Sequence, residues 1–180
     1  MNYATIKNCD ISNGPGIRVS LFVSGCTHKC KGCFNEVAWD FRYGEPFTTE
    51  VEDQILTMLS PDYIKGLTLL GGEPFEPQNQ EALVHFLRRV KAEFPQKSVW
   101  AFSGYLFDRD LAAGRVGDPA VTAEFLGYLD VLVDGPFIES RKDLMLRFRG
   151  SDNQRLIDVK RSLELGEVVL WEDWQGTGRR

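Results

Sequence analysis

Three cysteines stand within eight residues of one another. Cys26, Cys30 and Cys33 are separated by three residues and then by two. Thiolates this close in sequence converge on one centre, and soft sulfur ligands select zinc or an iron–sulfur cluster. Clustered cysteines in a reducing compartment bind metal or do chemistry more often than they form disulfides. The spacing therefore predicts a metal centre.

Zinc and a [4Fe–4S] cluster make different demands on the ligands. A structural zinc site needs a fourth ligand, for which Cys9 or His28 is available, but zinc motifs usually supply their ligands as two matched pairs. A cluster held by three cysteines instead of the usual four keeps one iron open. An open coordination position is typical of a catalytic metal site. The spacing favours the cluster, and a non-catalytic, zinc-stabilised interaction module is the alternative.

The residues near this motif also have ordinary interpretations. We expect Cys9 to be a partly buried small hydrophobic residue rather than a fourth ligand. We expect His28 to face solvent within the cysteine loop, and His85 to lie on the surface of a helix. Asp134 stands directly after a strand, where it can either cap a turn or contact a ligand.

The elements that position these residues alternate between strands and helices. Apolar residues alternate over 18–25, which predicts a strand, and the cysteines follow it directly. Helical patterns begin at Thr49 and cover 79–94 and 122–128. Further strands are predicted at 66–70, 98–102, 131–133, 145–148, 156–159 and 168–171. This alternation predicts β-α-β units and a mostly parallel sheet.

Three turns that contain glycine each follow a predicted strand, as the cysteine loop does. They are Gly71-Gly72, Ser103-Gly104 and Asp134-Gly135. Ligands of parallel α/β folds bind at the carboxyl ends of the strands. We therefore expect the three turns and the cysteines to share one face of the protein.

Length and composition narrow the choice of fold and function. The chain has 180 residues, of which 43% are hydrophobic and 26% charged. That length suits one domain over 1–180, with the segment from about 161 less clearly part of it. About six β/α units of roughly 30 residues fit, whereas a closed eight-unit barrel needs about 250 residues. The net charge of -5 disfavours nucleic-acid binding, and we expect a cytoplasmic chain without signal peptide or membrane span.

Two motifs resemble the radical S-adenosylmethionine (SAM) family. The first is Cys26-Thr27-His28-Lys29-Cys30-Lys31-Gly32-Cys33, and the second is Gly71-Gly72-Glu73-Pro74. In that family, three cysteines hold a [4Fe–4S] cluster and SAM chelates the fourth iron. An aromatic residue often precedes the third cysteine, but here that position is Gly32 and the aromatic residue is Phe34. The resemblance implies a partial, open (β/α)6-like parallel barrel.

Four further segments resemble a narrower family, the activating proteins of anaerobic ribonucleoside-triphosphate reductases. They are 13–18, 21–26, 130–135 and 148–154, so the likeness spans about residues 1–160. It implies an activase that cleaves SAM reductively and makes a glycyl radical on the reductase, with electrons from a reduced flavodoxin-like donor. An activase of another glycyl-radical enzyme, such as pyruvate formate-lyase, is the alternative within this class.

The resemblance also assigns roles to individual residues. Cys26, Cys30 and Cys33 would be the metal ligands, and no catalytic side chain beyond them is implied. The expected contacts with SAM come from two loops and two further strand ends. These residues are Gly32, Cys33, Phe34, Gly71, Gly72, Glu73, Ser103 and Asp134.

Overall fold

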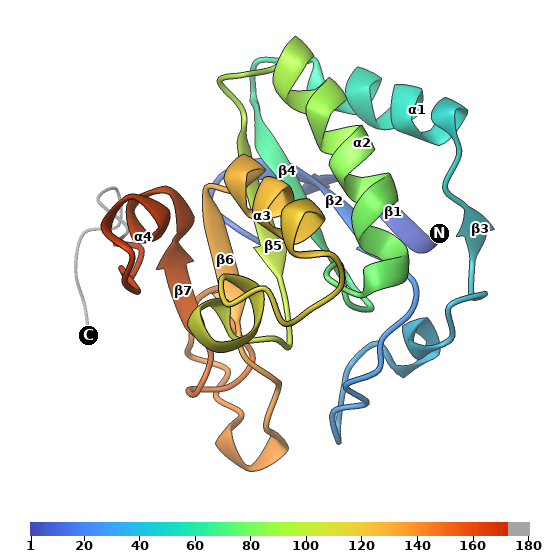
Figure 1. The fold of residues 1–180 in the computed structure, drawn as a ribbon. Coiled ribbons are helices and arrows are strands. Elements are labelled where there is room, and N and C mark those ends of the chain that lie inside the picture. The colour runs from blue at the N-terminus through green and yellow to red at the C-terminus, as the bar shows by residue number, and fades with distance from the viewer. Residues whose placement is uncertain (173–180) are drawn as a thin grey trace.

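Seven strands make one mixed sheet in the computed structural model, which describes residues 1–172 (Figure 1). Across the sheet the strands are ordered β3 (Glu45–Pro46), β1 (Asn2–Asp10), β2 (Ile17–Val23), β4 (Ile64–Gly71), β5 (Ser98–Phe102), β6 (Val131–Asp134) and β7 (Arg155–Asp158). The helices are α1 (Thr49–Leu59), α2 (Pro77–Glu93), α3 (Pro119–Tyr128) and α4 (Val159–Leu165), with short helical turns at Glu36–Trp39, Phe107–Leu111 and Glu139–Arg141. β3 and β7 are its edges, so the sheet is open.

The parallel part of the sheet consists of β2, β4, β5 and β6. α1, α2 and α3 make the three crossovers between these strands, fewer than the six units that length suggested. β1 is antiparallel to β2 because the loop 11–16 joining them is too short for a crossover helix. β3 and β7 are also antiparallel to their neighbours. The expectation of a mostly parallel sheet therefore holds for its centre and not for its margins.

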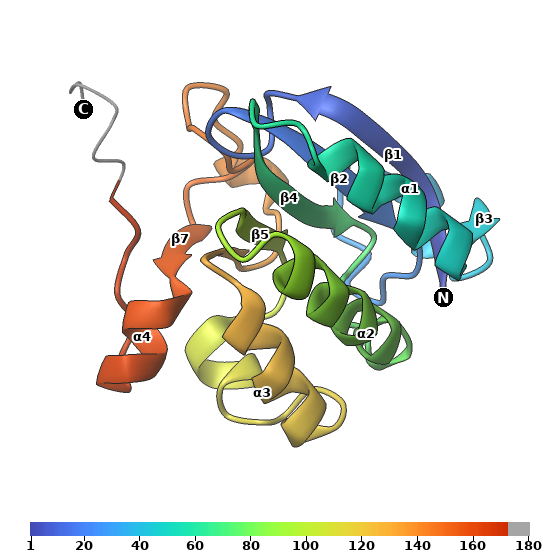
Figure 2. The same cartoon turned by 90° about the horizontal axis from the view of Figure 1, so that it is seen from above.

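The main core lies between the sheet and α1–α3, which cover the same face (Figures 1 and 2). Alternate residues of β2, namely Val19, Leu21 and Val23, point into this core, as a period of two requires. From α2, Leu83 and Leu87 meet them, which confirms the helical spacing that predicted this helix. In the part of the chain that the structure describes, no helix is long and apolar enough to cross a membrane.

A smaller cluster covers part of the opposite face. Trp100 of β5 lies at its centre, and the rings of Phe148 and Trp171 approach it edge-on, with centroids 5.5 and 5.0 Å away. Trp171 therefore packs on the sheet. Of the predicted strand 168–171, only Leu170 forms a β-bridge, to Ile157. The end of the expected domain, residues 173–180, lies outside the described chain.

One predicted strand is absent from the described residues, and β1 was not predicted. Residues 145–148 form a turn rather than a strand, because their apolar side chains divide between solvent, the cavity and the sheet. Helix α1 begins at Thr49 as predicted, but its N-cap, Thr48, makes no side-chain capping bond. Most side chains of β1 are exposed or half-buried, so the sequence shows no clear alternation there.

Candidate functional site

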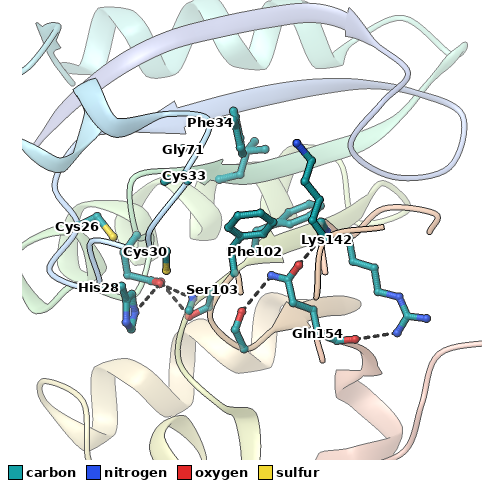
Figure 3. Close-up of a pocket in the computed structure, with 18 of the residues that line it drawn as sticks. Cys26, His28, Cys30, Cys33, Phe34, Gly71, Phe102, Ser103, Lys142 and Gln154 are labelled. Atoms are coloured by element: carbon teal, nitrogen blue, oxygen red, sulfur yellow. Dashed lines mark hydrogen bonds and ion pairs between the residues drawn. The ribbon is translucent and has the colours of Figure 1, made fainter. Parts of the chain in front are cut away.

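The predicted loops meet at the carboxyl ends of the parallel strands, as expected. The last residues of β2 and β4, Val23 and Gly71, are paired in register, so the cysteine loop (residues 26–33) and the glycine turn (71–73) start at the same level. A cavity of about 440 Å³ opens there (Figure 3). Its size lies within the roughly 300–1,000 Å³ of small-molecule sites.

All three cysteines of the motif line this cavity. The backbone N–H of Cys33 donates to the carbonyl of Cys30 at 3.1 Å, which folds this part of the loop into a tight turn. Among residues 1–172, no three Cys, His, Asp or Glu side chains stand close enough together to hold a metal ion. The three free thiols nevertheless share one cavity, and their chemistry suits an iron–sulfur cluster or zinc.

The thiols of Cys26 and Cys30 are protonated in the absence of metal. Burial raises the pKa of Cys26 to about 11 and also raises that of Cys30. Thiols bind metal as thiolates, so loading the site must release these protons. Cys9 is exposed and does not line the cavity, which corrects the expectation that it is partly buried.

Backbone hydrogen bonds fasten the cysteine loop to the glycine turn. The N–H of Gly72 donates to Val23 O at 2.7 Å, and the N–H of Glu73 donates to Gly25 O at 2.8 Å. This approach requires glycine, since a Cβ on Gly72 would lie 2.5 Å from Gly25 O. Gly71 has a φ of +110°, a backbone conformation that residues with a side chain rarely adopt. The two glycines therefore allow the loops to cross closely.

Glu73 connects three of the strand ends through its buried carboxylate, which is 1% exposed. Oε1 accepts hydrogen bonds from the Phe75 N–H and the Ser103 hydroxyl, both at 2.9 Å. Oε2 accepts from the Gly104 N–H at 2.7 Å and lies 3.1 Å from His28 Nε2 (Figure 3). Both oxygens are therefore engaged within the protein.

His28 points inward, contrary to the prediction that it faces solvent. Its side chain is 18% exposed, and its ring meets that of Tyr105 with centroids 4.4 Å apart. Burial alone would lower the pKa of His28, but hydrogen bonding to Glu73 and the negative charge of that group raise it. His28 thus joins the cysteine loop to the turn after β5. His85 is 63% exposed on α2, as expected.

Side chains at the N-terminal end of α2 form hydrogen bonds with the cysteine loop and its neighbours, beginning with Thr27, the first residue after Cys26. Oε1 of the buried Glu76 accepts from both the N–H and the hydroxyl of Thr27, at 2.7 and 2.6 Å. The side-chain amide of Asn79 donates to Ser24 O and Glu73 O, each at 3.0 Å. The N-terminal end of α2 therefore helps to position the cysteine loop.

A second wall of the cavity comes from the loop before β2, which contributes Ser12 and Asn13. Asp10 fixes this loop by accepting from the Ser12 N–H at 2.9 Å and the Asn13 amide at 2.6 Å, and it also accepts from the Ser20 hydroxyl. Although burial opposes ionisation, these hydrogen bonds lower the pKa of Asp10. The carboxylate thus remains charged over the ordinary pH range.

The structure brings all but one of the predicted contact residues to the cavity. Gly32, Cys33, Phe34, Gly71, Gly72, Glu73 and Ser103 line it. Asp134 is fully buried and does not line it. Its oxygens accept from Arg155, at 2.9 Å to Nε, and from the Phe107 N–H at 2.8 Å. The neighbouring Gly135 lines the cavity in its place.

Sequence reasoning missed most of the third wall, which comes from β5 and the segment 137–154 between β6 and β7. These residues include Phe102, Phe137, Lys142, Leu144, Leu146, Phe148, Arg149 and Gln154. Residues 141–149 carry several basic side chains, but nothing local to them shows that this segment returns to the cysteine loop. Only the tertiary fold reveals that contact.

Comparison with known proteins first gives the class. A family described as "4Fe-4S single cluster domain" matches residues 12–157, which include the three cysteines and the glycine turn. The fold and site therefore define an α/β protein of the 4Fe–4S class, consistent with the predicted cluster.

The relatives are more specific. The anaerobic ribonucleoside-triphosphate reductase-activating proteins of Enterobacteria phage T4 and Haemophilus influenzae are each 45% identical over 156 residues, covering 87% and 86% of this chain and 93% and 96% of theirs. The protein of the same name from Escherichia coli K12 is 42% identical over 156 residues, covering 86% of this chain and 96% of its own. The chain belongs to the family of anaerobic ribonucleoside-triphosphate reductase-activating proteins.

Proposed function

We propose that this chain is a radical-generating activase of an anaerobic ribonucleoside-triphosphate reductase. Cys26, Cys30 and Cys33 hold a [4Fe–4S] cluster with one open iron, and SAM is a consumed co-substrate. When bound, the cluster supplies one electron to the SAM sulfonium, which releases methionine and a 5′-deoxyadenosyl radical. That radical takes a hydrogen atom from a glycine Cα of the reductase, giving 5′-deoxyadenosine and a stored glycyl radical.

One observation carries this proposal. Three thiols from one loop share a cavity with the glycine turn at the carboxyl ends of parallel strands. Three cysteines leave a fourth coordination position for a ligand, which a structural site does not need. The cavity also has room for a small molecule beside the thiols. Membership of the activating-protein family supports the reductase as partner.

The residues of the chain bind and orient the co-substrate in this proposal. Gly71 and Gly72 let the backbone approach the methionine part, and Glu73 orients the turn and faces its ammonium group. Backbone groups of 32–34 contact the adenine, and Ser103 contacts the ribose or methionine part. The bonds of Asp134 to Arg155 and Phe107 support an indirect role, in which it holds the turn beside Gly135.

The proposal includes an electron source and a cellular setting. A reduced flavodoxin-like protein supplies the electron for each cleavage of SAM. The reaction takes place in the cytoplasm, where thiols stay reduced. The four free cysteines of the chain are compatible with that setting.

Anaerobic reconstitution tests the proposal. Iron, sulfide and zinc are measured first, and SAM and a strong reductant are then added to look for 5′-deoxyadenosine. The proposal expects about four irons and four sulfides per chain, followed by cleavage of SAM. A protein that takes up zinc instead, or a cluster that never yields 5′-deoxyadenosine, would reject it. Zinc uptake without turnover would favour the interaction module, and radical formation only on a pyruvate formate-lyase would favour the other activase.

A further inference from the structure

Large apolar side chains stand exposed at the mouth of the cavity. Phe34 lines the cavity and is 82% exposed, and Leu144 lines it and is 87% exposed. A residue that lines a cavity and is also largely exposed lies at its opening. Met145 follows Leu144 and is 88% exposed. We call Phe34, Leu144 and Met145 the apolar lip.

The two loops that carry the lip come from distant parts of the sequence. Phe34 follows the cysteine motif, whereas Leu144 and Met145 belong to the segment between β6 and β7. Both segments project beyond the carboxyl ends of the strands (Figure 1). A partner too large to enter the cavity whole contacts this surface when it approaches between the two loops.

Local hydrogen bonds fix the turn that carries Leu144 and Met145, so that these two side chains point outward. The Asp143 carboxylate accepts from the Met145 N–H at 2.8 Å, and Asp143 O accepts from the Leu146 N–H at 3.4 Å. The Asp143 N–H donates to Gly150 O at 3.3 Å, which closes the base of the loop. Leu146 lines the cavity, while Leu144 and Met145 project into solvent. The turn thus exposes two apolar side chains, although burying them would be energetically favourable.

The surroundings of the lip are basic. Residues 141–149 contain four basic side chains and one acidic one, a net charge of +3 in a chain whose total is -5. Arg141 forms an ion pair with Asp152, and Lys142 lines the cavity. A partner suited to this surface has apolar side chains that cover the lip and acidic side chains around them.

We propose that the apolar lip is the docking surface for the glycine-bearing segment of the reductase, an inference that rests on the proposed function. The segment places its glycine in the cavity, its apolar neighbours cover Phe34, Leu144 and Met145, and its acidic residues face the basic segment. Apolar contacts that become fully desolvated at the centre of an interface carry most of the binding energy. The exposed side chains of the lip therefore contribute to binding of the reductase, whereas the backbone of 32–34 is the part of this loop that contacts SAM.

Met145 is the residue with which to test this, because it does not line the cavity. Met145→Asp places a charge where the apolar contact is made, and Met145→Leu preserves that contact. Leu165→Asp is the matched control, since Leu165 is 62% exposed at the end of α4 and does not line the cavity either. For each reconstituted protein, three quantities are measured anaerobically: the Kd for the reductase, the glycyl radical formed at sub-saturating reductase, and 5′-deoxyadenosine formed without reductase.

We expect Met145→Asp to weaken binding about tenfold or more and to lower the radical yield, with 5′-deoxyadenosine formation unchanged. Met145→Leu and Leu165→Asp should match the wild type. Wild-type affinity in Met145→Asp, or an equal loss in Leu165→Asp, would overturn the docking surface, as would loss of SAM cleavage by Met145→Asp. If the wild type binds the reductase but never cleaves SAM, the proposed function fails, and the comparison of affinities still decides the docking surface.

Discussion

Replacing Glu73 by glutamine should destabilise the fold far more than the same change at Glu76, its neighbour in the next turn. Both side chains are buried, and both accept hydrogen bonds that hold the site. Glu73 uses its two oxygens for different donors: Oε1 faces the Phe75 N–H, and Oε2 faces the Gly104 N–H. Glu76 receives both bonds from Thr27 on Oε1 alone. A glutamine has one acceptor oxygen, so it can replace Glu76 but not Glu73.

The size of the difference follows from these contacts. In either orientation of its amide, the side chain introduced by Glu73→Gln would point an NH2 group at a backbone N–H, either the buried one of Phe75 or the partly buried one of Gly104. An unsatisfied buried donor costs about 1–3 kcal/mol, and the remaining bonds lose charge assistance worth about 1 kcal/mol. We therefore expect Glu73→Gln to cost about 2–4 kcal/mol and Glu76→Gln about 1 kcal/mol. For a chain of this length the Tm falls by roughly 2–4 °C per kcal/mol.

Thermal unfolding of the cluster-free proteins, followed by circular dichroism under anaerobic conditions, measures this difference. The expected Tm decrease is roughly 5–15 °C for Glu73→Gln and about 2–4 °C for Glu76→Gln. Equal decreases for the two variants would refute the reasoning. A Glu73→Gln protein with wild-type Tm that no longer binds SAM would show that the carboxylate is reserved for the ligand rather than for the fold.

Three further predictions concern the walls of the site. Gly72→Ala should lower stability by about 1–3 kcal/mol in urea unfolding, because the new Cβ would lie 2.5 Å from Gly25 O; an unchanged midpoint would contradict this close approach. Hydrogen bonds lower the pKa of Asp10 in the folded protein below its ordinary value of 3.8. The stability that the carboxylate adds is therefore fully present above pH 3.8 and is lost as the pH falls through the lower pKa of the folded state. The difference in free energy of unfolding between the wild type and Asp10→Asn should therefore be constant near neutral pH and decrease in acid. A difference that persists down to pH ~2 would rule this out. Iodoacetamide should modify the exposed Cys9 well before Cys26, whose buried thiol has a pKa of about 11; peptide mapping by mass spectrometry checks the order, and the reverse order would mean that the thiol of Cys26 is exposed.

Local patterns were sufficient for the centre of the fold. The alternation of Val19, Leu21 and Val23 indicates β2, and the helical spacing of Leu83 and Leu87 indicates α2. Each pattern reflects burial against a single layer, which a short window of sequence records. The same windows place the cysteines and glycine turns after strands, so their meeting at one cavity could be predicted.

Long-range contacts account for what the sequence did not show. His28 is buried because Glu73 and Tyr105 surround it, and both come from other loops. Asp134 follows a strand, as a ligand-binding residue would, but Arg155 from β7 occupies its oxygens. Leu146 has the apolar character of a strand residue, but it belongs to a turn whose side chains divide between solvent and cavity.

The most direct test of the central proposal is the glycyl radical itself. The reconstituted protein is mixed anaerobically with its reductase, SAM and a reductant, and the radical is measured by electron paramagnetic resonance. The wild type and Cys9→Ala should both produce the signal, and Ala at position 26, 30 or 33 should abolish it. A signal that survives loss of Cys26, Cys30 or Cys33, or that disappears in Cys9→Ala, would contradict the assignment of the three cysteines as the ligands of a cluster with one open iron.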